Sequence, residues 1–179
     1  MPRRRDTIVF YGRAVTPRRA VPIGMLALAE LHRRRPGTRI VIYGDPQPPK
    51  ASFPFEHAGV ASQEDLAVLY SEATVGLCLS MTNYSRVPAE MLACGLPCVD
   101  LEGYSAESVF GDDGPVELSA FSALELADHM ERLMDDEELW ARRSQAGIAF
   151  VAEHTWVAAA REVEAGLREA LRERGDPAS

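Results

Sequence analysis

Short apolar segments that do not alternate with polar residues set the strongest limit on how this chain can fold. Residues 74–79 are apolar at almost every position, and residues 98–101 have a similar character. A strand with one solvated face would alternate, so these segments predict parallel strands that helices cover on both faces. Residues 7–11 and 39–43 are further short β-branched or aromatic segments, each followed by glycine, and they predict two more strands.

Helical patterns separate these strands. Residues 21–34 carry apolar side chains at helical spacing and are followed by a Pro-Gly stop signal. The inner face of this helix is expected to comprise Ile23, Leu26, Ala27 and Leu31. Ser62 and Ser122 each stand three residues before an acidic residue, which is typical of helix caps. Further helices are expected after Ser62 and over residues 88–94, 123–134, 137–153 and 156–174.

The remaining segments complete an alternating pattern. Two weaker strands are expected near residues 57–60 and 116–118, and residues 45–54 and 103–115 are expected to be irregular. Strand-helix-strand order requires right-handed crossovers between parallel neighbours. The sequence therefore predicts an α/β fold with a Rossmann-like, doubly wound parallel sheet and helices on both faces. One domain is expected over residues 1–179.

Composition narrows the function. The formal charge of −8 over 179 residues argues against a general binder of nucleic acid or acidic membranes, so any phosphate site must be local. No apolar run reaches the roughly 20 residues of a transmembrane helix. The three cysteines lie in or beside apolar stretches without a second pair for a metal site. We expect reduced thiols, a cytoplasmic location, no metal site and no cofactor.

The first candidate loop spans residues 12–19 and follows the first strand. Gly12 supplies a turn, and Arg13, Arg18 and Arg19 precede a helix. Arginine forks match phosphate oxygens, and ligands of such sheets bind beyond the carboxyl ends of the strands. The alternative interpretation is a solvated basic loop.

The second candidate loop connects residues 74–79 to the next helix and is rich in hydroxyl and amide groups. A diphosphate could rest on it, close to a carboxylate one turn into the helix. The substrate-binding residues expected here are Ser80, Thr82, Asn83, Tyr84, Ser85, Arg86 and Glu90. Alternatively, Glu90 is only an exposed helix residue and Ser85 only a cap.

The third candidate loop contains His57, Gly59 and Val60. Glycine lets the backbone approach a flat ring, so Gly59 and Val60 are expected to contact the ligand. A lone histidine in such a position is more often structural, and this interpretation is preferred for His57.

The order of these segments resembles the C-terminal, donor-binding domain of family-4 (group 1) glycosyltransferases, which have a GT-B fold. The resemblance runs roughly from residue 7 to the helix at Trp156. Its most specific part is EMLACGLPCV at residues 90–99, which is similar to the block E-A-M-A-C-G-x-P-V-V of that family. Gly12-Arg13 after a strand and the segment from His57 to Val60 occur in the same order as in the family.

The resemblance implies roles for individual residues. Glu90 matches the second glutamate of the E-x7-E motif, which binds the ribose hydroxyls of the nucleotide. Arg13 matches the arginine that faces the donor diphosphate, and either Arg18 or Arg19 matches the lysine that follows. These three arginines would stabilise the leaving diphosphate, and no metal is needed for that. The resemblance leaves no other catalytic residue assigned.

One position departs from the family. Thr82 stands where the family has its first glutamate, which usually meets the transferred sugar. This departure leaves the donor sugar open. The segment from residue 79 to 88 is more similar to a subgroup that includes bacterial rhamnosyltransferases of surface polysaccharides.

The family implies two lobes, with the acceptor held by an N-terminal lobe that this chain lacks. We therefore expect this chain to bind a nucleoside-diphosphate sugar for polysaccharide or glycoconjugate synthesis, and to transfer no sugar alone. Two alternatives remain open at this stage. One is a non-catalytic nucleotide-binding or interaction module on the same scaffold. The other is half of a sugar-nucleotide epimerase, although acid and base residues for that reaction are not evident.

Overall fold

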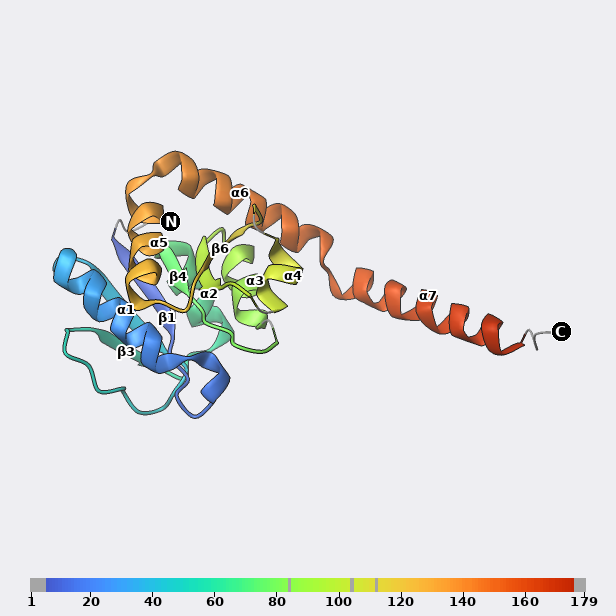
Figure 1. Ribbon diagram of the computed structural model, residues 1–179, viewed down its shortest axis with the longest axis horizontal. Helices are drawn as coiled ribbons and strands as arrows, with labels where there is room; N and C mark the ends of the chain where they lie inside the picture. The colour runs from blue at the N-terminus through green and yellow to red at the C-terminus, as the bar shows by residue number, and fades with distance from the viewer. Residues whose placement is uncertain (1–5, 84, 104, 112, 176–179) are drawn as a thin grey trace.

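Six parallel strands form one sheet in the order β3-β2-β1-β4-β5-β6 (Figure 1). The computed structural model describes residues 6–83, 85–103, 105–111 and 113–175. The chain order changes direction between β1 and β4, which are neighbours at the centre of the sheet. The strands are β1 (Thr7–Tyr11), β2 (Arg39–Tyr43), β3 (Glu56–Gly59), β4 (Val75–Leu77), β5 (Cys98–Leu101) and β6 (Val116–Ser119).

Helices cover both faces of this sheet. The helices are η1 (Pro17–Arg19, a 3-10 turn), α1 (Val21–Arg34), α2 (Gln63–Glu72), α3 (Arg86–Ala93), α4 (Ser105–Phe110), α5 (Ala123–Asp135), α6 (Glu137–Glu153) and α7 (Trp156–Gly175). Strand β1 shows how the two layers arise, because Ile8 and Phe10 pack with α1 and α5 while Val9 packs with α2, α3 and α4. The predicted doubly wound α/β fold is confirmed.

Helix caps fix where several helices begin. The Ser62 side chain accepts a hydrogen bond from the amide of Asp65, and the Ser122 side chain accepts one from the amide of Glu125. Asp136 caps α6 in the same way through the amide of Leu139. The two serine caps agree with the sequence prediction, since each side chain replaces a helical bond that the first turn lacks.

Three details of the sequence prediction were wrong. Leu26 is 60% exposed, and Leu28 takes its expected place in the core, because α1 turns Gly24, Ala27 and Leu31 inward. The segment over residues 103–115 is not wholly irregular, since α4 begins there at Ser105 and buries Ala106 and Phe110. Helix α3 begins two residues earlier than expected, where Ser85 acts as its cap.

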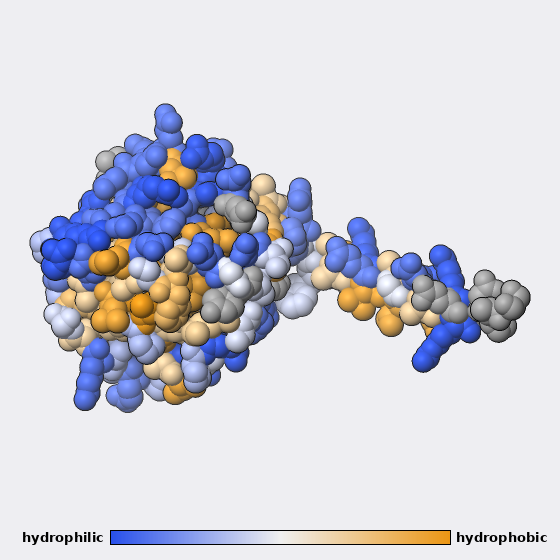
Figure 2. All heavy atoms as spheres, viewed as in Figure 1, coloured by the Kyte–Doolittle hydropathy of each residue, from blue (hydrophilic) through white to orange (hydrophobic). Residues whose placement is uncertain are grey.

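Helix α7 extends away from the body of the domain (Figure 1). None of its described side chains is buried, and apolar residues gather along one side of it (Figure 2). Val163, Leu167 and Leu171 are each more than 60% exposed. In the described part of the chain, no helix is both long and apolar enough to cross a membrane.

Two buried carboxyl groups lie in the sheet, and their surroundings differ. Glu117 on β6 is 2% exposed and accepts hydrogen bonds from His129 Nδ1 at 3.1 Å, from Arg143 Nε at 2.6 Å and from Arg132. Burial alone would raise the pKa of Glu117, but the hydrogen bonds from His129 and Arg143 and the two arginine charges lower the pKa to about 2. Glu117 thereby ties α5 and α6 to the edge strand.

Asp100 on β5 has the opposite balance. Its Oδ1 accepts hydrogen bonds from the amides of Ser80 at 2.7 Å and Leu101 at 2.8 Å, and Oδ2 has no hydrogen-bond partner among the described residues. Burial raises the pKa of Asp100 to about 7, although these hydrogen bonds and the charge of Arg19 act in the other direction. The carboxyl group is therefore partly protonated near neutral pH.

The Glu117 cluster predicts a pH-dependent loss of stability. Glu117→Gln should lower the free energy of unfolding by about 2 to 4 kcal/mol at pH 7, because a buried carboxylate is lost and the half-buried Arg143 and the exposed Arg132 lose their charged partner. A lowered pKa stabilises the fold above the unfolded value of 4.5, and this contribution disappears as pH falls toward 2. The difference between wild type and variant in urea unfolding should therefore shrink below pH 4. Glu125→Gln, at an exposed position on α5, is the control and should change little.

Asp100 predicts the reverse dependence. Its raised pKa stabilises the fold below pH 3.8, and that contribution is lost as pH rises through 7. Relative to Asp100→Asn, wild type should lose about 2 to 3 kcal/mol of unfolding free energy between pH 5 and pH 8. Parallel stability curves for the two proteins over this range would contradict the assignment.

Candidate functional site

Three loops meet at the carboxyl edge of the sheet, and backbone hydrogen bonds join them. The amide of Gly12 donates to Tyr43 at 2.9 Å, and the amide of Gly44 donates to Gly59 at 2.7 Å. The amide of Met81 donates to the carbonyl oxygen of Arg18 at 2.9 Å. The loops after β1, β3 and β4, which the sequence singled out separately, therefore form one continuous rim.

A larger residue would be disfavoured at two glycines of this rim, for different structural reasons. A Cβ atom at Gly12 would lie 2.7 Å from Ile42 Cγ2, so a larger residue would push the first loop away from β2. Gly59 has a φ of +62°, a backbone conformation that side chains disfavour, and open space surrounds it. Val60 beside it is 73% exposed. His57 is bonded through Nε2 to the carbonyl oxygen of Asp45 at 2.9 Å, in keeping with its structural interpretation.

The three arginines of the first loop differ in their freedom. Arg13 and Arg18 are exposed, whereas Arg19 is 8% exposed. The Arg19 guanidinium donates from Nη1 to Ser80 Oγ at 3.0 Å and lies 5.5 Å from the centre of the Tyr11 ring. Arg19 is thus tied to the second loop through Ser80, while Arg13 and Arg18 remain open to solvent.

The second loop is held at both ends. At its start, Ser80 is buried and bonds both Arg19 and Asp100. Thr82 and Asn83 are exposed, with Thr82 Oγ1 donating to Asn83 Oδ1 at 3.1 Å. At its end, Ser85 Oγ accepts a hydrogen bond from the amide of Val87 at 3.1 Å. Tyr84 lies outside the described residues.

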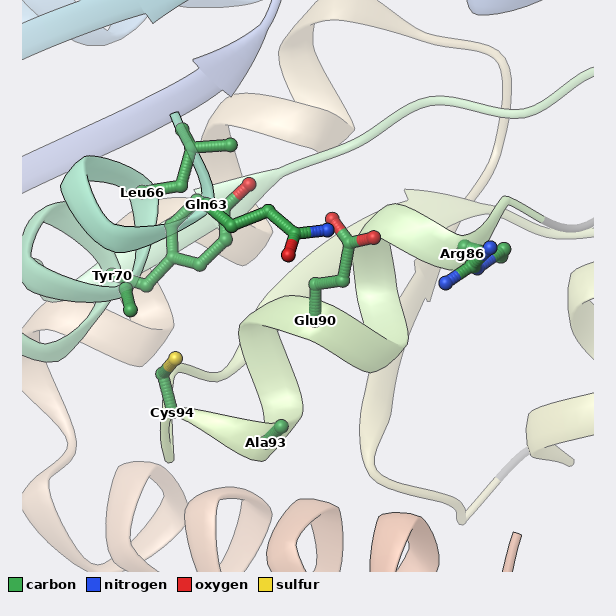
Figure 3. A pocket seen from close by; sticks show the side chains of 8 residues that line it. Gln63, Leu66, Tyr70, Arg86, Glu90, Ala93 and Cys94 are labelled. Atoms are coloured by element: carbon green, nitrogen blue, oxygen red, sulfur yellow. The ribbon is translucent and has the colours of Figure 1, made fainter. Parts of the chain in front are cut away.

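Glu90 stands one turn into α3 with its side chain exposed. It lines a cavity of about 270 Å³ between α2 and α3 (Figure 3). The Gln63 amide and the Glu90 carboxylate point toward each other in this view. The cavity is lined by Gln63, Leu66, Ala67, Tyr70, Arg86, Glu90, Ala93 and Cys94. Arg86 and Glu90 are the two residues of this cavity that the sequence had selected.

The sequence did not select the α2 residues of this cavity, because Leu66 and Tyr70 recur at the spacing of side chains that face a core. Tyr70 belongs to the core and also lines the cavity. Its ring is buried, and its hydroxyl is hydrogen-bonded to that of Tyr43. Burial raises the pKa of Tyr70 above its usual value, and burial followed by the nearby Glu90 raises that of Cys94. Both groups are therefore neutral at physiological pH. The position of Gln63 directly after the Ser62 cap is the one signal in the sequence that could have identified it.

A second cavity of about 490 Å³ lies on the other side of α3. Arg86 and Glu90 line it together with residues from the junction of α6 and α7, among them His154 and Trp156. The Arg86 guanidinium lies 5.0 Å from the centre of the Trp156 ring. Helix α3 therefore presents the same two charged residues to both cavities.

The site can bind anions and hydroxyl groups. Its exposed cations sit on the first loop, two capped helix N-termini adjoin it, and Glu90 offers a carboxylate as an acceptor. Among the residues that the structure describes, no group of three or more histidine, cysteine or acidic side chains is arranged to hold a metal ion.

Comparison with known proteins is consistent with this arrangement. The family model "WsaF, C-terminal domain" matches residues 6–105, which is more than half of the chain. The O-antigen biosynthesis protein RfbC of Myxococcus xanthus is 34% identical over 97 residues, covering 51% of this chain and 8% of that protein. This chain therefore spans less than a tenth of the length of that curated relative.

Solved structures share the fold at low sequence identity. HepE of Anabaena in complex with UDP-glucose has a TM-score of 0.75 at 16% identity, covering 93% of this chain and 49% of that one. The sucrose-phosphate synthase of Thermosynechococcus elongatus has a TM-score of 0.74 at 20% identity, over 94% and 46% of the two chains. The C-terminal domain of a group 1 glycosyltransferase, LpcC of Francisella tularensis, has a TM-score of 0.70 at 16% identity, over 86% and 87%.

These matches confirm the resemblance to the C-terminal half of a GT-B glycosyltransferase, while the rhamnosyltransferase subgroup stays a prediction. The matched family model covers the three loops and the α3 helix described above. This chain belongs to the family of the WsaF C-terminal domain.

Proposed function

We propose that this domain binds the nucleoside-diphosphate sugar donor of a glycosyltransferase that acts in polysaccharide or glycoconjugate synthesis. The observation that carries the proposal is the position of Glu90, which is exposed, lines a cavity between α2 and α3, and stands on the helix that directly follows the second loop. An exposed carboxylate in such a place can accept hydrogen bonds from two vicinal hydroxyls of a nucleotide sugar.

The relatives support this substrate class. HepE was crystallised with UDP-glucose and with UDP, and RfbC of Myxococcus xanthus is an O-antigen biosynthesis protein. The fold that this chain shares with HepE supports a ligand at the carboxyl edge of the sheet, where open α/β sheets bind their ligands. A donor with a nucleoside, a diphosphate and a sugar would match a site with an acceptor carboxylate, exposed arginines and a hydroxyl-rich loop.

Within this proposal each loop contacts a different part of the donor. Gly59 and Val60 adjoin the nucleoside base, and Glu90 binds the hydroxyls of its sugar ring. Arg13 and Arg18 face the diphosphate from the first loop, and Thr82 and Asn83 face it from the second. Ser85 is 3% exposed and contributes as the cap of α3. As the bond to the transferred sugar breaks, negative charge grows on the diphosphate, and fixed cations and helix N-termini stabilise that charge.

Arg19 has a supporting role in this scheme. Its guanidinium is buried and donates a hydrogen bond to Ser80. Arg19 therefore joins the second loop to the first and adds a positive charge close to both. The acceptor and a second lobe belong to the same proposal. The chain spans about half the length of HepE and of the sucrose-phosphate synthase, which leaves room in such proteins for a lobe that carries the acceptor.

Glu90→Ala tests the proposal. Calorimetric titration with uridine, thymidine, guanosine, adenosine and cytidine diphosphates should identify a nucleotide that wild type binds. The variant should bind it more weakly by about 1 to 3 kcal/mol, because hydrogen bonds to a charged acceptor are lost. Glu138→Ala, at an exposed position on α6, is the matched control and should bind like wild type. Unchanged affinity in the Glu90 variant would exclude this role.

Arg13→Ala and Arg18→Ala test the diphosphate contacts. Each should weaken the binding of the nucleoside diphosphate by about 1 to 3 kcal/mol and leave binding of the unphosphorylated nucleoside unchanged. Because these side chains are exposed, the effect should decline as salt screens the charges. Arg161→Ala on α7 serves as the control for net charge. Equal losses for nucleoside and nucleoside diphosphate would show that these arginines do not meet the phosphates.

A further inference from the structure

Arg86 and Glu90 lie four residues apart on α3, a spacing at which side chains of opposite charge meet on the surface of a helix. An ion pair between them would occupy the carboxylate that the proposed function assigns to the donor. Among the described residues, however, Glu90 takes part in no hydrogen bond and no ion pair. The Arg86 guanidinium instead makes a contact outside this pair.

Trp156 supplies that contact. It is the first residue of α7, and the Arg86 guanidinium lies over its ring at 5.0 Å from the ring centre. Figure 3 shows Glu90 turned toward Gln63, with Arg86 on the opposite side of Glu90 in this view. The side chain of Arg86 thus points to the junction of α6 and α7, where the second cavity begins.

General energetics favour the observed arrangement. On a helix surface an ion pair with the cation four residues before the acid is the weaker of the two possible orders. A guanidinium over the face of a tryptophan ring is at least as strong an interaction at an exposed site. The indole ring is therefore able to compete with Glu90 for Arg86.

We propose that Trp156 is a positioning residue that holds Arg86 away from Glu90 and so keeps the Glu90 carboxylate open for the hydroxyls of the nucleoside. The proposal rests on the function proposed for Glu90. Trp156 itself contacts no donor in this scheme. It links α7 to the binding site, because the first turn of α7 sets where the Arg86 side chain lies.

The test measures hydroxyl recognition separately from affinity. The probes are the nucleoside diphosphate that wild type binds most tightly in the calorimetric panel and its 2′,3′-dideoxy counterpart. The dissociation constant of the dideoxy compound divided by that of the nucleoside diphosphate reports how much the hydroxyls contribute to binding. Trp156→Ala should lower this ratio by a factor of about 1.5 to 2, the competition expected from a surface ion pair at this spacing. A purely structural or phosphate-directed role would weaken both probes equally and leave the ratio unchanged.

Rescue variants make the result specific. Trp156→Phe keeps an aromatic face for the guanidinium and should retain most of the ratio. Trp156→Ala combined with Arg86→Gln should restore the ratio, because the competing cation is gone. Val157→Ala, at the neighbouring exposed position, is the matched control and should match wild type. Trp156 is 76% exposed, so thermal unfolding should show all these variants to be folded.

The outcomes separate the two proposals. If wild type does not distinguish the two nucleotides, the role of Glu90 itself fails. If wild type distinguishes them and Trp156→Ala does so equally well, the role of Trp156 is overturned while that of Glu90 stands. A lowered ratio that the additional Arg86→Gln change does not restore would also overturn it, since Arg86 would then not be the competitor.

Discussion

The parallel direction of all six strands is the constraint on which the site depends. Because the strands are parallel, every strand ends at the same edge of the sheet, and the loop that follows each strand begins there. Helices provide the crossovers except between β2 and β3, which residues 44–55 join without a helix. Buried apolar strands fill the two cores, and the polar groups of the loops are left to the rim. The rim after β1, β3 and β4 is therefore where cations, hydroxyls and helix N-termini collect, although their segments lie far apart in the sequence.

The buried residues of this rim have a structural role, and the exposed ones are available for binding. A buried hydrogen-bond network fixes the position of the second loop and joins it to β5; its members are Arg19, Ser80 and Asp100. Arg13, Arg18 and Glu90 remain exposed and are available to a ligand. A chain with a net charge of −8 can in this way present exposed cations locally, because Arg13 and Arg18 are exposed while several acidic residues are paired with arginines, as Glu30 is with Arg33 and Arg34.

Helix α3 lies where these effects combine. Its first turn is capped by Ser85, its inner face packs into the core through Met91 and Leu92, and its outer face carries Arg86 and Glu90 between two cavities. The packing of α3 against α6 fixes the position of the α6–α7 junction relative to the site. The contact of Trp156 with Arg86 then connects α7, which otherwise extends away from the domain, to the helix that carries Glu90.

The sequence by itself determined the order and class of the elements, because strands buried on both faces and capped helices leave local patterns that need no knowledge of distant contacts. It also selected Glu90 and the arginine loop. Tertiary structure decided the rest. Leu26 is exposed and Leu28 buried because α1 is rotated by its packing against α5, which local periodicity cannot show. Likewise, Arg19 is buried while Arg13 and Arg18 are free, and Gln63 and Tyr70 share a cavity with Glu90. These differences arise from contacts between segments that only the folded sheet brings together.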